Sequence, residues 1–247
     1  MLRRNRVYRI LRTSVTIIAA AWRYFWLTTR ARWRWSAPGQ ATWDRAHRKT
    51  GRAIYKLATS LGGAYVKLGQ ILGGRGDFFP QAFVEPLSTL HDQVPPRPFS
   101  ELSEHIEREL GRPLDEVFLS VDEEALAAAS LAQVHRGVLV SGEDVAIKIQ
   151  YPEAQRLFPT DLGSLRRAVR VARWLNRSLD LRPVVDELAH FVVLELDFSR
   201  EAASTEKVRQ NMEASGLEGV VIPRVHAELS TDKLLVLEYV QGVSLAS

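Results

Sequence analysis

Lys148 is the residue whose surroundings point most directly to chemistry. It lies in VAIKIQYP at 145–152, a short apolar run typical of a strand. A lysine in such a strand can hold its ammonium against the phosphates of a nucleotide, provided that an acidic side chain keeps it in position. The segment ELDFSREA at 195–202 supplies a suitable acid in Glu201. Taken alone, each residue is more typical of a solvated surface charge, so the prediction needs further motifs.

The segment LAAASLAQVHRG at 126–137 precedes this lysine, where a phosphate-covering loop is expected. Alanines stand there in place of the usual glycines. Glycine permits positive φ and a close approach of backbone N–H groups to phosphate, whereas each alanine adds a Cβ that restricts both. The composition therefore predicts a stiffer loop that is less able to wrap a triphosphate in the usual way. Tight packing of small residues is the structural alternative.

Five motifs occur in a fixed order along the chain: AYVKLGQ at 64–70, AAASLAQVHRG at 127–137, VAIKIQYP at 145–152, ELDFSREA at 195–202 and LLVLEYVQG at 234–242. Together they resemble the UbiB/AarF family of atypical kinase-like proteins, which is associated with quinone biosynthesis. The resemblance covers about residues 43–247 and rests on the ordered set, since no single motif is specific.

The resemblance implies roles for particular residues. Lys148 and Glu201 would form the catalytic ion pair. A regulatory contact would join the KxGQ extension to the acidic ExD motif, through Lys67, Gln70, Glu195 and Asp197. Lys67 and Gln70 are three residues apart, so a helix places them on one face. Adenine nucleotide, ATP or ADP, would contact Ala127, Ala128, Ala129, Ser130, Ala132, Val134, Lys148, Glu238 and Val240.

Phosphoryl transfer of the kinase type also needs a catalytic aspartate and metal-binding residues in a second lobe. The sequence contains no HxD stretch and no DFG. We therefore expect an N-terminal portion that lacks the C-lobe and is inactive alone, with Mg²⁺ bound only when that lobe is present. No metal site is expected within the chain itself, because it has no cysteine and its six histidines show no ligand spacing.

Basic charge is concentrated at the N-terminus. Residues 1–35 hold nine arginines and no acid; subtracting these nine from the 33 basic residues leaves 24 against 29 acidic residues. On a helix, Val7, Leu11, Val15 and Trp22 share an apolar face, and Arg9 lies on the other. Five of the six tryptophans lie between residues 22 and 43, which suits a membrane interface. One alternative is that the apolar side of this helix packs on the rest of the protein. Another is nucleic-acid binding, which we do not expect.

The remaining pattern predicts an α+β fold, a protein-kinase-like N-lobe with an antiparallel sheet, an N-terminal helical KxGQ extension and inserted helices. We expect an arm at 1–40, the extension at 41–116 and the nucleotide lobe at 117–247. Helices are predicted over 43–72, 83–90, 100–110 (with a serine cap), 162–175 and 183–212. Strands are predicted in VFLSVD, LAQVHRGVLV, DVAIKIQY, VVIPRVHAEL and KLLVLEYV.

The function expected from this reasoning is a membrane-associated atypical kinase or ATPase that binds adenine nucleotide and acts in quinone (ubiquinone-type) or lipid metabolism. It would lie peripherally on the cytoplasmic face of a membrane through residues 1–35. Its partners would be quinone-pathway proteins or lipids. The alternative is a non-catalytic, nucleotide-sensing scaffold at the membrane surface.

Overall fold

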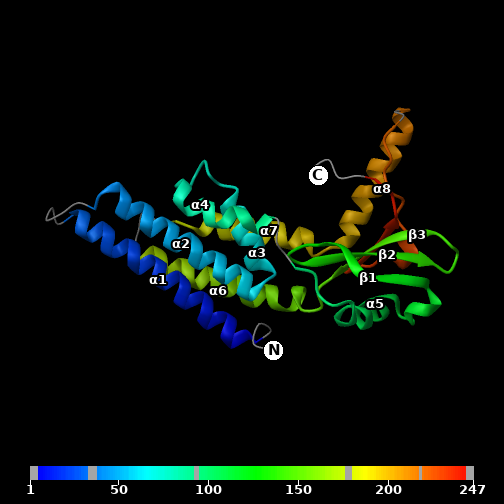
Figure 1. The fold of residues 1–247 in the computed structure, drawn as a ribbon, viewed down its shortest axis with the longest axis horizontal. Helices are drawn as coiled ribbons and strands as arrows, with labels where there is room; N and C mark the ends of the chain where they lie inside the picture. The colour runs from blue at the N-terminus through cyan, green and yellow to red at the C-terminus, as the bar shows by residue number, and fades with distance from the viewer. Residues whose placement is uncertain (1–4, 33–37, 92–94, 176–179, 217–218, 243–247) are drawn as a thin grey trace. The chain divides into compact units, whose positions relative to one another are not determined.

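The structure is a computed structural model that describes residues 5–32, 38–91, 95–175, 180–216 and 219–242 (Figure 1). Contacts divide the chain into two compact units, Met1–Val94 with Glu153–Val192 and Pro95–Pro152 with Val193–Ser247. The boundaries of these units differ from those of the predicted arm, extension and nucleotide lobe. The functions assigned to those three ranges stay predictions. In the described residues, no helix is long and apolar enough to cross a membrane.

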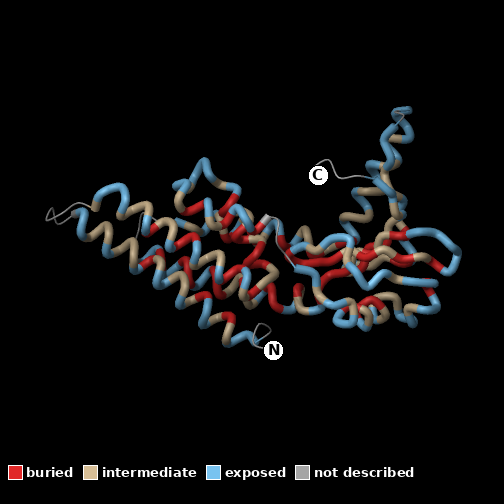
Figure 2. Tube along the Cα trace, in the orientation of Figure 1, coloured by how far each residue is buried: buried red, intermediate tan, exposed pale blue. Residues whose placement is uncertain are grey.

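The first unit is a bundle of helices. Its members are α1 (Arg6–Arg32), α2 (Gln40–Leu61), α3 (Ala64–Gly73), α4 (Gln81–Ser88), α6 (Ala154–Leu175) and α7 (Arg182–Glu195), of which the last reaches into the range of the second unit. α1 packs along α6 and α2, and α2 packs against α4 and α3. Figure 2 shows buried positions along each of these helices. The buried side chains include Leu57, Leu68, Leu87 and Leu165.

The helical run predicted over 43–72 is interrupted. α2 ends at Leu61, and α3 begins at Ala64. Gly62 and Gly63 between them have φ of 67° and 57°, a region that residues with a Cβ rarely adopt. The two glycines therefore redirect the chain between two helices that the apolar periodicity alone does not separate.

α1 turns part of its polar side toward the bundle. Arg9 is buried, and its guanidinium donates to the two carboxylate oxygens of Asp161 at 2.6 and 2.5 Å and to the carbonyl of Leu61 at 2.7 Å. One turn later, the buried Thr13 hydroxyl lies 2.5 Å from that of Tyr65. An arginine can be buried in this way because a carboxylate and a carbonyl satisfy its donors.

The opposite side of α1 carries a line of exposed apolar side chains, which we name the α1 stripe: Val7, Leu11, Val15, Ile18, Trp22 and Trp26. Its members follow each other at steps of three or four residues, and each is between 41% and 67% exposed. The alternative in which this apolar side packs on the body is therefore wrong for these six residues. Arg3, Arg4, Trp33, Arg34 and Trp35 of the predicted arm lie outside the described residues.

The second unit is built on a four-stranded sheet in the order β1 (Phe118–Ala128), β2 (Ala132–Leu139), β3 (Asp144–Gln150) and β4 (Leu234–Glu238), with every pair antiparallel. Helices α5 (Ser103–Leu110) and α8 (Phe198–Ser215) and the short 3-10 turns η3 (Phe99–Glu101), η4 (Leu114–Glu116) and η5 (Ala227–Leu229) complete it. On β3, Val145, Ile147 and Ile149 alternate into the core with no exposed surface. The predicted α+β fold with an antiparallel sheet is confirmed.

Two local predictions for this unit are wrong. The run VVIPRVHAEL is not a strand, because only Val225 forms a bridge, to Leu237. Ser100 does not cap α5, because it lies in η3 and α5 begins at Ser103 without a side-chain cap. The predicted end of α5 is correct, since Gly111 closes it in the left-handed conformation with φ of 70°.

The buried ion pair of α1 gives the first prediction. Burial raises the pKa of Asp161, and the hydrogen bonds from Arg9 oppose that shift. Replacing Arg9 with Met removes the partner and leaves the carboxyl group buried, so we expect the free energy of unfolding to fall by about 3–5 kcal/mol. Urea denaturation of the purified chain measures this loss.

Two further variants test the cause. Arg9→Met combined with Asp161→Leu removes both charges, and we expect it to recover most of the lost stability. Arg48→Met breaks an exposed pair with Glu85 at 2.7 Å and serves as the control, with a much smaller expected loss. Equal losses for Arg9→Met and Arg48→Met would contradict the role assigned to the buried pair.

Candidate functional site

Lys148 lies in the middle of the sheet. In the β-ladder it pairs with Val134 on β2 and with Leu235 on β4, and Val134 in turn pairs with Ala127 on β1. Directly paired residues project from the same face of a sheet, so Ala127, Val134 and Lys148 form one row across it. The row places small, uncharged side chains on one side of the lysine.

The ammonium of Lys148 is held by the carboxylate of Glu201. Its Nζ donates to Oε1 at 2.6 Å and to Oε2 at 2.7 Å, and it lies 4.7 Å from the ring centroid of Phe198. The side chain of Lys148 is 28% exposed and that of Glu201 41% exposed. The ammonium is therefore fixed in direction and still reachable from solvent. The structure brings these two predicted residues together, and their catalytic role stays a prediction.

Glu201 reaches the sheet because the start of α8 is anchored there. Phe198 is buried against Ala132 and Leu235, and its backbone N–H donates to the carbonyl of Asp232 at 2.9 Å. Glu201 follows in the first turn of α8, where the positive end of the helix dipole favours a carboxylate.

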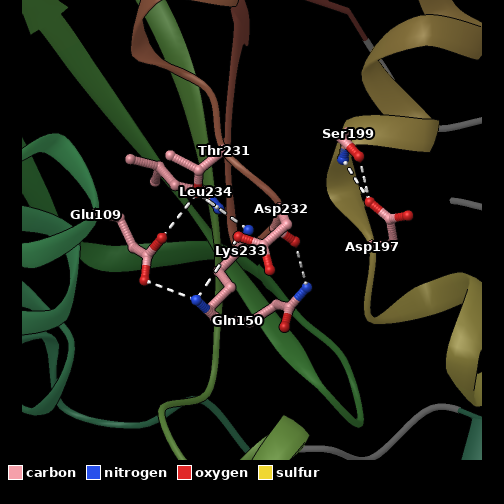
Figure 3. A network of polar contacts seen from close by, with 8 residues as sticks. All are labelled: Glu109, Gln150, Asp197, Ser199, Thr231, Asp232, Lys233 and Leu234. Carbon is pink, nitrogen blue, oxygen red and sulfur yellow. Dashed lines mark hydrogen bonds and ion pairs between the residues drawn. The ribbon is translucent and has the colours of Figure 1, made fainter.

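The turn before β4 supports this anchor (Figure 3). The hydroxyl oxygen of Thr231 accepts from the backbone N–H groups of Lys233 and Leu234, both at 3.1 Å, and the hydroxyl donates to Glu109 of α5 at 2.9 Å. The ammonium of Lys233 lies 3.3 Å from the other oxygen of Glu109. This turn therefore fixes α5 to the start of β4.

The same turn is joined to β3. The side-chain amide of Gln150 donates to the carbonyl of Asp232 at 2.9 Å, and its backbone N–H donates to the carbonyl of Lys233 at 3.0 Å. Sequence reasoning missed these residues. The polar run STDK before an apolar strand signals a turn, but it does not identify the distant side chains that the turn holds.

The alanine-rich segment is mostly strand, which corrects its description as a loop. Ala127 and Ala128 end β1, and Ala132 begins β2. Ala129 to Leu131 alone form the connection, closed by a hydrogen bond from the backbone N–H of Ala129 to the carbonyl of Ala132 at 2.8 Å. Most of the alanines therefore lie in regular strand backbone, which any residue with a Cβ adopts.

Two other predicted nucleotide contacts lie in the same hairpin. Ser130 is buried in its turn, and Val134 is half-buried in β2. Glu238 ends β4, and its carboxylate accepts from the backbone N–H of Arg224 at 3.2 Å. Val240 lies beyond β4 and is 45% exposed. Contact of these residues with a nucleotide stays a prediction.

The KxGQ residues lie on α3 in the first unit. Lys67 and Gln70 are both half-buried, and the Gln70 side-chain amide donates to the carbonyl of Leu90 at 3.0 Å. Gly69 between them has a physical reason, because a Cβ there would come within 2.3 Å of the buried side chain of Leu90. Glycine at this position of the motif thus permits close packing of α3.

The acidic motif lies where α7 passes into α8. The helix predicted over 183–212 is broken here, so Glu195 ends α7 while Glu201 belongs to α8. Asp197 caps α8, and its carboxylate accepts from the backbone N–H of Ser199 at 3.2 Å and from the Ser199 hydroxyl (Figure 3). Glu195 and Asp197 belong to the second unit, and their predicted contact with the KxGQ residues stays a prediction.

The geometry defines a sheet that presents an oriented lysine ammonium, which is suited to binding a phosphate group. Among the described residues, no group of three or more His, Asp or Glu side chains is arranged to hold a metal ion. A strand lysine paired with a helix glutamate is the arrangement of the nucleotide lobe of kinases, so fold and site define a kinase-like lobe.

Comparison with protein families agrees with this class. The family described as the ABC1 atypical kinase-like domain matches residues 89–247. The chain therefore belongs to the ABC1 family of atypical kinase-like proteins, and the resemblance to UbiB/AarF proteins is confirmed.

Individual relatives give the same result. The chain is 34% identical over 229 residues to the uncharacterized protein sll1770 of Synechocystis, covering 90% of this chain and 38% of that protein. It is 33% identical over 199 residues to the AarF domain-containing protein kinase 1 of Mus musculus, covering 81% of this chain and 38% of that protein. The chain thus spans less than half the length of these relatives.

A solved structure is similar as well. The complex of Rv3197 with erythromycin from Mycobacterium tuberculosis aligns with a TM-score of 0.51 and 32% sequence identity, covering 84% of this chain and 52% of that chain.

The turn before β4 gives the second prediction. Thr231→Val keeps the shape of the side chain and removes the hydroxyl that serves two backbone N–H groups and Glu109. We expect the free energy of unfolding to fall by about 1–3 kcal/mol, because these groups lose their partner. We also expect faster hydrogen exchange at the amides of Lys233 and Leu234.

Thr59→Val is the matched control, since the exposed Thr59 hydroxyl bonds only to carbonyls of its own helix. It should change neither stability nor exchange at the turn. Unchanged exchange in Thr231→Val would show that the hydroxyl does not hold the turn.

Proposed function

We propose that the chain is the nucleotide-binding lobe of a membrane-associated atypical kinase or ATPase that acts in quinone (ubiquinone-type) or lipid metabolism. The observation that carries the proposal is the pair of contacts between the Lys148 ammonium and both oxygens of Glu201, at 2.6 and 2.7 Å. ATP or ADP is the ligand whose phosphates suit an ammonium that is charged, oriented and partly exposed. Membership of the ABC1 family supports the same reaction class.

The residues around Lys148 fit an adenine nucleotide. Ala127 and Val134 share its row on the sheet, and neither carries a charge that would repel phosphate. Mg²⁺ and the transferring residues belong, in this proposal, to a second lobe of the whole protein. The chain alone would bind nucleotide without turning it over. The substrate that receives phosphate is not part of the proposal.

Nucleotide binding gives the third prediction. We expect Lys148→Ala to weaken ADP binding by the 247-residue chain about 10- to 100-fold, because a charge-assisted contact to phosphate is lost. Glu201→Gln should weaken it less, because the lysine remains but loses its fixed direction. Isothermal titration calorimetry measures both, with the exposed Lys207→Ala on α8 as the control. Equal affinity in Lys148→Ala and the unsubstituted chain would refute the proposed site.

A non-catalytic, nucleotide-sensing scaffold is the second candidate, favoured by the short alanine-rich hairpin beside the lysine. ATP turnover by a full-length protein separates the two. Turnover that is lost in Lys148→Ala supports the enzyme, whereas binding without turnover supports the scaffold.

The α1 stripe supports the membrane part of the proposal. Large apolar side chains exposed in one line, including two tryptophans, suit insertion at the headgroup level of a bilayer. The exposed Arg12 and Arg30 flank the stripe at helical spacing and favour anionic lipid. A peripheral position on the cytoplasmic face of a membrane is therefore part of the proposal. Lipids and quinone-pathway proteins are its proposed partners.

Liposome flotation gives the fourth prediction. Deletion of α1 is unsuitable as a test, because α1 also packs into the bundle. Val15→Gln combined with Trp22→Gln changes two members of the stripe, and we expect at least roughly tenfold weaker binding to vesicles containing anionic lipid. The matched control replaces an exposed valine and tryptophan elsewhere, Val208→Gln with Trp174→Gln. Equal effects of the two pairs would contradict binding through the stripe.

A further inference from the structure

The helical unit contains a cavity of about 350 Å³, partly open to solvent, that the nucleotide proposal does not use. We infer that this cavity is a binding site for a small, mainly hydrocarbon ligand that ends in one uncharged oxygen, as in an aliphatic alcohol. The volume lies within the range of small-molecule sites, roughly 300–1,000 Å³. The site lies wholly within the first unit and does not depend on whether the chain binds nucleotide.

The walls of the cavity are apolar and come from several helices. They include Ile17 and Ala20 of α1, Leu57 of α2, Leu72 of α3, Phe83 of α4 and Val169 of α6. Apolar atoms that line such a cavity are packed against protein on one side only and lack close contacts on the other. The lining also gives water few hydrogen-bonding partners. A hydrocarbon body is therefore the occupant that restores the missing contacts.

One end of the cavity is polar. The Tyr24 hydroxyl of α1 lies 2.8 Å from Nδ1 of His47 on α2, and both residues line the cavity together with Thr50. The Thr50 hydroxyl donates to the carbonyl of Ala46 at 2.9 Å and accepts from Arg23 at 2.7 Å, so it is already engaged. A phenolic oxygen offers one donor and two acceptor positions. The Tyr24 hydroxyl already contacts His47, and its remaining acceptor position can receive a hydrogen bond from a ligand hydroxyl.

The side chains that line this polar end are uncharged, and the Arg23 guanidinium, which donates to Thr50, is not part of the lining. Burial raises the pKa of Tyr24, a shift opposed by hydrogen bonding to Thr50 and by the charge of Arg23, and burial lowers the pKa of His47. Both side chains are thus neutral near pH 7. Among the described residues that line the cavity, none is Asp, Glu, Lys or Arg. A neutral oxygen suits these partners, whereas a carboxylate would be desolvated without a charge partner in the lining.

The test compares 1-octanol with octanoate, which share a hydrocarbon chain and differ in the charge of the end group. Calorimetry and thermal unfolding are measured on the 247-residue chain. We expect 1-octanol to bind and to raise the unfolding temperature. We expect octanoate to bind at least about tenfold more weakly at pH 7.5. Absence of 1-octanol binding, or tighter binding of octanoate, would overturn the inference.

Two variants locate the site. Tyr24→Phe removes only the hydroxyl, and we expect about three- to tenfold weaker 1-octanol binding, with Tyr8→Phe on the same helix as the control. Ala20→Leu fills the cavity and should abolish binding, whereas Ala19→Leu, on the exposed side of α1, should not. If Ala20→Leu fails to fold, the Tyr24→Phe comparison still decides. Equal 1-octanol affinity in Tyr24→Phe and Tyr8→Phe would overturn the assigned polar end. ADP binding by Lys148→Ala tests the proposed nucleotide site separately from the cavity.

Discussion

The candidate site depends on how the start of α8 is tied to the sheet. Phe198 is buried against Ala132 of β2 and Leu235 of β4, and its backbone N–H donates to the carbonyl of Asp232 at 2.9 Å, so the first turn of α8 is held against the sheet. The carboxylate one turn into α8 then lies opposite Lys148. Because neither charge is deeply buried, the pair avoids most of the desolvation cost of an interior ion pair. The geometry of the Lys148–Glu201 pair is set by the packing of β3 and α8, which carry the two residues, rather than by the attraction between the charges.

The helical unit contains an ion pair that is buried, unlike the partly exposed pair of Lys148 and Glu201. Arg9 and Asp161 are almost without exposed surface, so each needs hydrogen-bond partners inside the protein. The guanidinium donates to the Asp161 carboxylate and to the Leu61 carbonyl, and the carboxylate accepts from the guanidinium. That requirement fixes the rotation of α1 about its own axis. With Arg9 held inward, Tyr24 also faces the bundle, and the α1 stripe is left on the outside.

Sequence reasoning predicted the sheet and the lysine–glutamate pair well, for different reasons. The strands around Lys148 could be predicted from their local composition. Glu201 of α8 was identified as its partner only from the ordered set of motifs. The rotation of α1 was not predictable, because an amphipathic pattern does not say which face packs, and Asp161 lies 152 positions from Arg9. The turn network was missed for the same reason: Thr231 is an ordinary turn residue, and its partner Glu109 lies 122 positions away. The sequence around a polar residue does not show which distant residue will be its hydrogen-bond partner.

α1 connects two proposals that rest on separate observations. Its inner face lines the cavity through Ile17, Ala20 and Tyr24, and its outer face presents the stripe. A ligand in the cavity fills contacts among α1, α2 and α6, and it therefore stabilises the packed position of α1. In the membrane proposal, a bilayer binds the stripe of the same helix in that position. Hydrocarbon ligands concentrate in bilayers, so in these two proposals the membrane would also supply the ligand of the cavity.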